Sequence, residues 1–407
     1  MKTLQAHQRA TLLYAFMTSV FDLADKLFGV VFILIASSNG ITPMQISIQF
    51  AVASISVAIF DYPSGNISDR IGRKKTAGLG YMAFGIGMII YGMVTSFYGY
   101  IFAIIVIQLG IALISGSPIS WLIDFLKDHN KMEYKDTVVP KLRGSSTLFA
   151  AVGALFAAYL VRFGYSIPLF VGGAIAIANG LVTLLVMEDN YGEGQEESIV
   201  GQIITNTKDF MKSKNMILLL IRSSISGAGF LAFILAWQVY GVEVIKVDPS
   251  LIGILMTVFM LIISGSSFLT AKLNKHFKPI HVSVAGTIIQ GIGLLVVMAV
   301  PNVYGFVGGI CVFELGFAME VASYGAWLHD YIPSGQRATF FSGLSALSSL
   351  IGFFSSLLIG WIINTFGYTA IWLFAGCMNI GAGVFLMVIK NALSQANVGD
   401  SLSMGTN

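Results

Sequence analysis

The chain of 407 residues has few charged residues, few prolines and only two cysteines. Lys, Arg, Asp and Glu make up 11% of it, whereas a soluble domain carries roughly 25%, which argues against a soluble globular protein. Cys311 and Cys377 lie inside apolar segments without the spacing of metal ligands, so they indicate no metal site. A net charge of +3, without a basic tract that contains aromatic residues, argues against a nucleic-acid partner.

The sequence also lacks the motifs of an enzyme. It has no Walker loop for phosphate binding, no cluster of metal ligands and no Ser, His and Asp set. We therefore expect neither a membrane-embedded enzyme nor a pump driven by ATP, and we expect no cofactor. The first apolar segment carries three charged residues and no small-residue cleavage site follows it, so we expect an intact N-terminus rather than a signal peptide.

Apolar residues are abundant and form long segments along nearly the whole chain. They make up 56% of the sequence, and the segments have the roughly 20 residues that a helix needs to cross a bilayer. Helices satisfy their own backbone hydrogen bonds, which lipid cannot do. We predict an all-α membrane protein with twelve transmembrane helices in two pseudo-symmetric six-helix bundles. The predicted spans lie near 10–36, 43–68, 76–96, 99–126, 143–162, 166–187, 216–241, 250–271, 280–299, 303–329, 338–362 and 367–390.

The longest polar connection divides the chain into two halves. We predict an N-terminal six-helix bundle at 1–187, a cytoplasmic linker at 188–215, a C-terminal six-helix bundle at 216–390 and a disordered cytoplasmic tail at 391–407. Apolar residues between 199 and 211 of the linker recur at helical spacing. They fit either an amphipathic helix on the membrane surface or a partly ordered tether.

Lys and Arg residues fall mostly in the loops on the N-terminal side of the predicted membrane. The opposite loops hold only Arg162 and Lys246. Since cytoplasmic loops carry an excess of Lys and Arg, this asymmetry predicts that both termini are cytoplasmic. An even number of spans is consistent with this, and we expect a multi-pass protein of the plasma or inner membrane.

An internal repeat relates the two halves. The fourth predicted span ends in Trp121-Leu122-Ile123-Asp124 and the tenth in Trp327-Leu328-His329-Asp330, at an offset of roughly 200 residues. The sixth and twelfth spans open with Phe163-Gly164-Tyr165 and Phe366-Gly367-Tyr368. Two such halves form parallel repeats about an axis normal to the membrane, with the substrate site at their interface.

The loop after the second span is dense in cations. It reads Gly65-Asn66-Ile67-Ser68-Asp69-Arg70-Ile71-Gly72-Arg73-Lys74-Lys75, with glycines that permit a sharp turn. This pattern, together with the twin Trp-Leu-x-Asp endings, resembles the major facilitator superfamily of secondary transporters over about residues 10–390. The resemblance implies alternating access by rocking of two bundles.

The resemblance also implies a cytoplasmic gate. Asp69 would contact cationic and helix-end groups, and Arg73 would pair with Asp124, which ends the fourth span. Arg143 is the matching base on the fifth span, and Asp330 with Arg337 would form a C-terminal copy. The other predicted gate residues are Asp61, Gly65, Arg70 and Gly72. The alternative is that the cations only hold the loop in the cytoplasm, which we prefer for Lys74 and Lys75.

Ionisable residues inside predicted spans are costly and usually face a cavity or a partner. Asp22, Asp25 and Lys26 share one helical face near mid-membrane. Lys26 can neutralise one carboxylate, which would leave the other free to carry a proton or bind a cation. The alternative is a static ion pair that locks the first span to a neighbour.

The seventh and tenth spans carry Arg222, Glu314 and Glu320. In the family that the chain resembles, spans one, four, seven and ten line the cavity, so these residues would face it. Arg222 and Glu320 should lie at similar depths, and we predict that they pair when no anionic substrate is bound. Glu314 would bind substrate or protons.

The combined prediction is a monomeric, proton-coupled transporter of a small organic solute. Several acids and few bases in the cavity favour export of a cationic or neutral amphipathic solute. The Gly-Pro signature of drug antiporters in the fifth span is absent, since Gly153 is followed by Ala154. Uptake of an organic anion or a sugar, with Lys26 and Arg222 as ligands, is the alternative. A non-transporting membrane sensor with the same fold is another.

Overall fold

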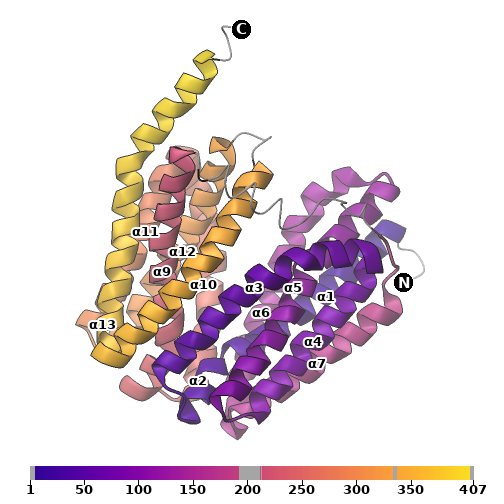
Figure 1. The fold of residues 1–407 in the computed structure, drawn as a ribbon, viewed down its shortest axis with the longest axis horizontal. Coiled ribbons are helices and arrows are strands. Elements are labelled where there is room, and N and C mark those ends of the chain that lie inside the picture. The colour runs from indigo at the N-terminus through magenta and orange to yellow at the C-terminus, as the bar shows by residue number, and fades with distance from the viewer. Residues whose placement is uncertain (1–4, 192–210, 212, 333–336, 404–407) are drawn as a thin grey trace. The chain divides into compact units, whose positions relative to one another are not determined.

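The structure, a computed structural model, describes residues 5–191, 211, 213–332 and 337–403. In this part of the chain the regular structure is helical throughout (Figure 1). Two compact units are present. The N-terminal unit comprises residues 1–199 and 241–260, and the C-terminal unit comprises residues 200–240 and 261–407.

In the N-terminal unit, long helices pack side by side (Figure 1). They are α1 (Ala6–Gly29), α2 (Phe32–Ser38), α3 (Pro43–Ile71), α4 (Arg73–Met93), α5 (Phe97–Asp128), α6 (Lys135–Leu160) and α7 (Ser166–Val186), with 3₁₀ turns at Met132–Tyr134 and Val161–Phe163. α4 packs between α5 and α7, α1 packs against α6 and α7, and α3 packs against α5.

The C-terminal unit has the same kind of packing. Its helices are α9 (Lys214–Val239), α11 (Pro279–Ala299), α12 (Val303–Tyr331) and α13 (Arg337–Ser403), together with the second part of α10 (Pro249–His276). A π-helical turn at Tyr240–Val244 follows α9. α11 packs against α12 and α13, and α9 packs against α13.

Ten helices of the described chain are long and apolar enough to cross a membrane. α1 is not among them; its first turn is polar and its second half carries Asp22, Asp25 and Lys26. The last of the ten covers Leu347–Lys390 and contains a non-helical residue at Gly367, with φ of +78°. The chain is therefore an all-helical membrane protein, as predicted, and the count of twelve spans stays a prediction.

The first predicted span, 10–36, is not one continuous helix. α1 ends at Gly29 and α2 begins at Phe32, with Val30 and Val31 between them. Glycine and β-branched valine both have low helix propensity, and here they follow one another. By contrast, the turn predicted at Gly72 is present, because φ of +99° there separates α3 from α4.

Glycines at matching positions give the two units the same helix packing. A Cβ on Gly85 of α4 would lie 2.5 Å from the carbonyl oxygen of Gly173 on α7. A Cβ on Gly291 of α11 would lie 2.6 Å from the carbonyl oxygen of Gly376 on α13. Gly85 and Gly291 are separated by the same offset as Trp121 and Trp327, so the repeat predicted from the helix ends extends into the packing of the units.

The structure describes little of the predicted linker, but it describes the predicted tail as far as Ser403. Most of the linker, including the segment of helical spacing, lies outside the described residues. α13 continues to Ser403, where a disordered tail was predicted from residue 391. Leu393 is fully buried in an apolar cluster with Leu386 and Ile389. Because this residue lies beyond Lys390 and packs in the core, it stabilises a further helical turn there.

Candidate functional site

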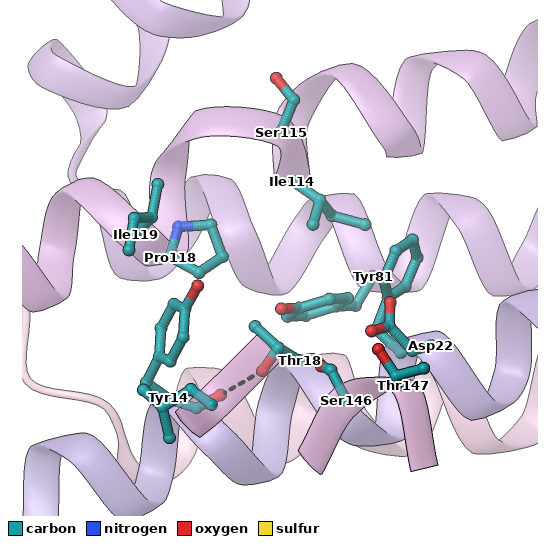
Figure 2. Close-up of a pocket in the computed structure, with 12 residues that line it drawn as sticks. Tyr14, Thr18, Asp22, Tyr81, Ile114, Ser115, Pro118, Ile119, Ser146 and Thr147 are labelled. Carbon is teal, nitrogen blue, oxygen red and sulfur yellow. Dashed lines mark hydrogen bonds between the residues drawn. The ribbon is translucent and has the colours of Figure 1, made fainter. Parts of the chain in front are cut away.

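A cavity of about 460 Å³ lies inside the N-terminal unit, beside Asp22 (Figure 2). α1 contributes Tyr14, Thr18 and Asp22 to its wall. These three residues follow one another at intervals of four, which places them on one helical face. The cavity is therefore built around a single stripe of α1.

Three further helices close this cavity. Tyr81 comes from α4, Pro118 from α5 and Ser146 from α6. The Ser146 hydroxyl donates a hydrogen bond to the Asp22 carboxylate. Of the described residues that line the cavity, only Asp22 carries a formal charge, and its other neighbours are aromatic rings, hydroxyls and aliphatic groups. Such a wall can hold one cationic group against an apolar body.

Asp25 and Lys26, which were predicted to act with Asp22, form a separate pair. The Lys26 ammonium lies 2.7 Å from the Asp25 carboxylate, and the two side chains are 27% and 33% exposed. Lys26 thus pairs with Asp25, one of the two carboxylates that it could neutralise. Asp22 is the carboxylate that remains beside the cavity.

In the C-terminal unit, Arg222 of α9 forms the predicted pair with Glu320 of α12. Their side chains meet at 2.7 Å and are 2% and 10% exposed. Arg222 also donates a hydrogen bond of 3.0 Å to the Thr287 hydroxyl of α11. Its guanidinium carbon lies 4.0 Å from the centre of the Tyr324 ring, a cation–π contact. The Arg222 guanidinium thus has a carboxylate, a hydroxyl and an aromatic ring as partners.

Glu314 lies on α12, less than two turns before Glu320, and is 7% exposed. Within the described chain it has no ion pair or hydrogen bond. The preceding residue, Phe313, packs against Phe233 with ring centres 4.2 Å apart. A buried carboxyl group without a partner is more stable in its protonated form.

Three of the predicted gate residues, Asp69, Arg73 and Asp124, meet at one end of α4. Arg73 forms an ion pair with Asp124 of α5, as predicted, and a longer contact of 3.4 Å with Asp69 of α3. It also donates a hydrogen bond of 2.8 Å to the Ser120 carbonyl oxygen. A smaller cavity of about 240 Å³ borders Arg73 and Asp69 and is lined mostly by serines.

The other predicted gate residues do not join this cluster in the described part of the chain. Arg70 is exposed at the end of α3. The remaining five belong to helices, but their side chains lie outside the described part of the chain: Asp61 and Gly65 in α3, Arg143 in α6, Asp330 in α12 and Arg337 in α13. The predicted C-terminal copy of the gate therefore stays a prediction.

The sequence predicted the charged residues of these sites but not the residues around them. Tyr14 and Thr18 could have been predicted as neighbours of Asp22, because they precede it at helical intervals of four. Tyr81 and Ser146 could not be predicted in this way, since each lies on a different helix from Asp22. Among the described residues, no group of three or more His, Cys, Asp or Glu side chains is placed to hold a metal ion.

Comparison with known proteins finds matches that cover nearly the whole chain. A family model described as Major Facilitator Superfamily matches residues 14–245 and 223–400. The chain is 22% identical over 397 residues to an uncharacterized MFS-type transporter, YxaM, of Bacillus subtilis (strain 168), and the match covers 93% of each chain. It is 24% identical over 209 residues to Multidrug resistance protein 2 of the same organism, covering 51% of this chain and 48% of that one.

Solved structures share the fold. The nucleoside transporter NupG superposes with a TM-score of 0.74 at 13% identity, covering 93% of this chain and 98% of that one. A D-xylose–proton symporter superposes with a TM-score of 0.66 at 15% identity, covering 93% and 94%. At these identities the likeness establishes the fold but not the substrate.

Proposed function

The chain belongs to the major facilitator superfamily, and from this premise we propose that it is a secondary active transporter that exports a small organic solute. The family consists of membrane transporters and not of enzymes. The proposed solute is amphipathic and either cationic or neutral, and it leaves in exchange for protons by alternating access. The likeness to a protein named for multidrug resistance supports the direction of transport.

The observation that carries this proposal is the cavity beside Asp22. Its wall combines one carboxylate with the aromatic rings of Tyr14, Phe21 and Tyr81. A carboxylate attracts an ammonium group, and ring faces attract it further while they cover its apolar substituents. A volume of about 460 Å³ suits a drug-sized molecule, because ligand pockets typically measure about 300–1,000 Å³.

Proton coupling in this proposal uses Asp22 and Glu314. Neither carboxyl group forms an ion pair among the described residues, whereas Asp25 pairs with Lys26, which also attracts Asp22 from a greater distance. Burial favours the protonated form of a carboxyl group, and a cationic solute favours the charged form. Proton and solute therefore compete for the same carboxylate, which is the requirement for exchange.

The gate in this proposal is the cluster of Arg73, Asp69 and Asp124. A buried arginine with two carboxylates holds α3, α4 and α5 together at one end of the unit. The asymmetry of Lys and Arg residues supports a cytoplasmic location for this end and for both termini. We also propose twelve spans in two six-helix bundles at 1–187 and 216–390, and a monomer in the plasma or inner membrane.

Uptake of an organic anion is a second candidate, and Arg222 favours it. The Nε atom of this buried arginine has no hydrogen-bond partner in the described chain. An incoming carboxylate could take the place of Glu320 on the guanidinium, with bidentate geometry. Lys26, the other proposed anion ligand, is less suited because Asp25 already binds it.

Flux into proteoliposomes separates the two candidates. The probes are an aromatic ammonium cation, its neutral isostere and its carboxylate isostere. An exporter that exchanges solute for protons accumulates the cation when the vesicle interior is acidic. A symporter of anions accumulates the carboxylate when the exterior is acidic. Binding without any pH-driven flux would contradict both candidates and indicate a sensor.

A further inference from the structure

The four residues Glu188–Tyr191, which follow α7, lie against the gate. They are the last described residues before the connection to α9. They were assigned to the linker from their polarity alone. In the structure their backbone and side chains make hydrogen bonds to both helices that carry the Arg73–Asp124 ion pair. We call them the clasp segment.

The clasp segment caps the N-terminus of α4. The backbone N–H of Lys74 donates a hydrogen bond of 3.3 Å to the Asp189 carboxylate, and the backbone N–H of Arg73 donates one of 3.1 Å to the Asn190 carbonyl oxygen. A helix normally receives such a cap from its own preceding residue. Here that residue is Gly72, which has no side chain, so Asp189 supplies the acceptor from a distant part of the chain.

The charge of Asp189 suits this position. The first turn of α4 contains Arg73, Lys74 and Lys75 and no acidic residue. Cations are unfavourable at a helix N-terminus, because the helix dipole places partial positive charge there. A carboxylate beside the exposed N–H groups offsets both the dipole and the neighbouring cations.

The clasp segment also holds α5 near Asp124. The indole N–H of Trp121 donates a hydrogen bond of 2.7 Å to the Glu188 carbonyl oxygen. The Asn190 side-chain amide donates one of 3.2 Å to the Trp121 carbonyl oxygen. Trp121 is 2% exposed and lies less than one helical turn before Asp124. The helices that carry the two partners of the ion pair are therefore both hydrogen-bonded to the same short segment.

Gly72 is explained by the same contact. A Cβ at this position would lie 2.4 Å from the Asp189 carboxylate oxygen, far inside contact distance. The glycine of the loop motif therefore leaves room for the carboxylate of the clasp segment, in addition to permitting φ of +99°.

We propose that Asp189 and Asn190 are positioning residues of the gate, which hold α4 and α5 at the separation that the Arg73–Asp124 ion pair needs. This inference rests on the proposed role of that pair as a gate. Asp189 acts as a hydrogen-bond acceptor and as a charge, and Asn190 acts through its carbonyl and amide groups. Neither residue lines the cavity beside Asp22.

The test measures how readily water-soluble maleimide reaches a cysteine behind the gate. The probe position is Ser117→Cys in a full chain with Cys311→Ser and Cys377→Ser, reconstituted in lipid vesicles. Ser117 is 3% exposed, lines the serine-rich cavity beside Arg73 and lies 3.0 Å from the Ser68 hydroxyl. Its labelling is therefore slow when the gate is intact.

Loss of an N-cap typically shifts the folding equilibrium of a helix end about fivefold. If opening of the gate follows this equilibrium, we expect Asp189→Ala to raise the labelling rate by the same factor. Asp189→Asn keeps an acceptor for the Lys74 N–H and should raise it less than about twofold. The matched control is Glu188→Gln, which removes the same charge from an exposed neighbour whose role here is only through its backbone. Equal rates for Asp189→Ala and Glu188→Gln would overturn the inference.

A double-mutant cycle with Asp124→Asn separates the inference from the function on which it rests. If Asp189 acts through the ion pair, Asp189→Ala adds less than about twofold once Asp124→Asn is present, because coupled residues are not additive. Fully additive effects would show that Asp189 stabilises the unit independently of the gate. If Asp124→Asn itself leaves labelling unchanged, the gate assignment fails and the inference fails with it.

Discussion

The sequence Trp-Leu-x-Asp lies near the C-terminal end of both α5 and α12, but its tryptophan has different surroundings in the two units. Trp121 is buried and its indole N–H is bound to the Glu188 carbonyl oxygen. Trp327 is half-buried and stacks between Tyr324 and Tyr331, with ring centres 5.8 Å and 5.1 Å away. The repeat therefore preserves the residues of the helix end but not their contacts, which come from the segment after α7 in one unit and from the same helix in the other.

The ionisable residues inside the two units also differ in their surroundings. Asp22 of the N-terminal unit borders a cavity, with a hydroxyl as its partner. Arg222 of the C-terminal unit is enclosed by Glu320, Thr287 and the Tyr324 ring. One unit presents an ionisable group to a space that can hold a ligand, and the other keeps its cation in a closed network. We infer that the N-terminal unit provides most of the solute specificity.

The largest expected effect on stability lies in the C-terminal unit. Arg222→Met leaves Glu320 as a buried carboxylate without its partner, and breaking such a pair typically costs about 3–5 kcal/mol. Arg222→Met with Glu320→Leu should recover most of this loss, because neither charge remains. Chemical unfolding in detergent measures both variants. A loss below about 1 kcal/mol for Arg222→Met would mean that the pair is solvated, as is typical of surface pairs.

The largest expected effect on transport lies in the N-terminal unit. Asp22→Asn keeps the size of the side chain but removes the charge that attracts the cation. We expect cation flux to fall by about 100-fold, which corresponds to ~2.7 kcal/mol of lost interaction. Asp25→Asn, three residues along α1, is the matched control and should reduce flux much less. Equal losses for the two variants would place the cation site elsewhere.

The shared helix packing predicts matched losses of stability in the two units. Gly85→Ala and Gly291→Ala each bring a Cβ into a neighbouring helix backbone. Overpacking of this kind costs about 1–3 kcal/mol, and we expect the two variants to differ by less than ~1 kcal/mol. Melting temperatures of the two purified variants test this. A large loss in only one unit would mean that the repeat does not extend to the packing of α7 and α13.

The smallest expected effect distinguishes the two tryptophans. Trp121→Phe keeps an aromatic ring but leaves the Glu188 carbonyl oxygen without its donor, so we expect a loss of about 1 kcal/mol. Trp327→Phe keeps the stacking between two tyrosines and should cost less than ~0.5 kcal/mol. Thermal unfolding of the two variants, measured side by side, checks the difference. Equal losses would show that the indole N–H of Trp121 contributes nothing.

The sequence predicted the helical fold, because apolar segments of membrane length require helices. The ion pairs needed more than spacing. Arg73–Asp124 was expected from the family resemblance of the loop, and Arg222–Glu320 from the similar depth of two charges on spans that line the cavity in that family. The contact of Asp189 with the α4 N-terminus could not be predicted, because it joins segments far apart in the chain. The burial of Leu393 likewise depends on packing that periodicity does not describe, whereas the helix break after Gly29 follows from low local helix propensity that the span prediction did not weigh.

Proton release on binding is the measurement that tests the central claim most directly. The aromatic ammonium cation is added to the purified protein in a weakly buffered solution, and the released protons are counted. If solute and proton compete for the carboxyl group of Asp22, about one proton leaves for each cation bound, and Asp22→Asn abolishes the release. Binding of the cation without release, or the same release from Asp22→Asn, would contradict the account.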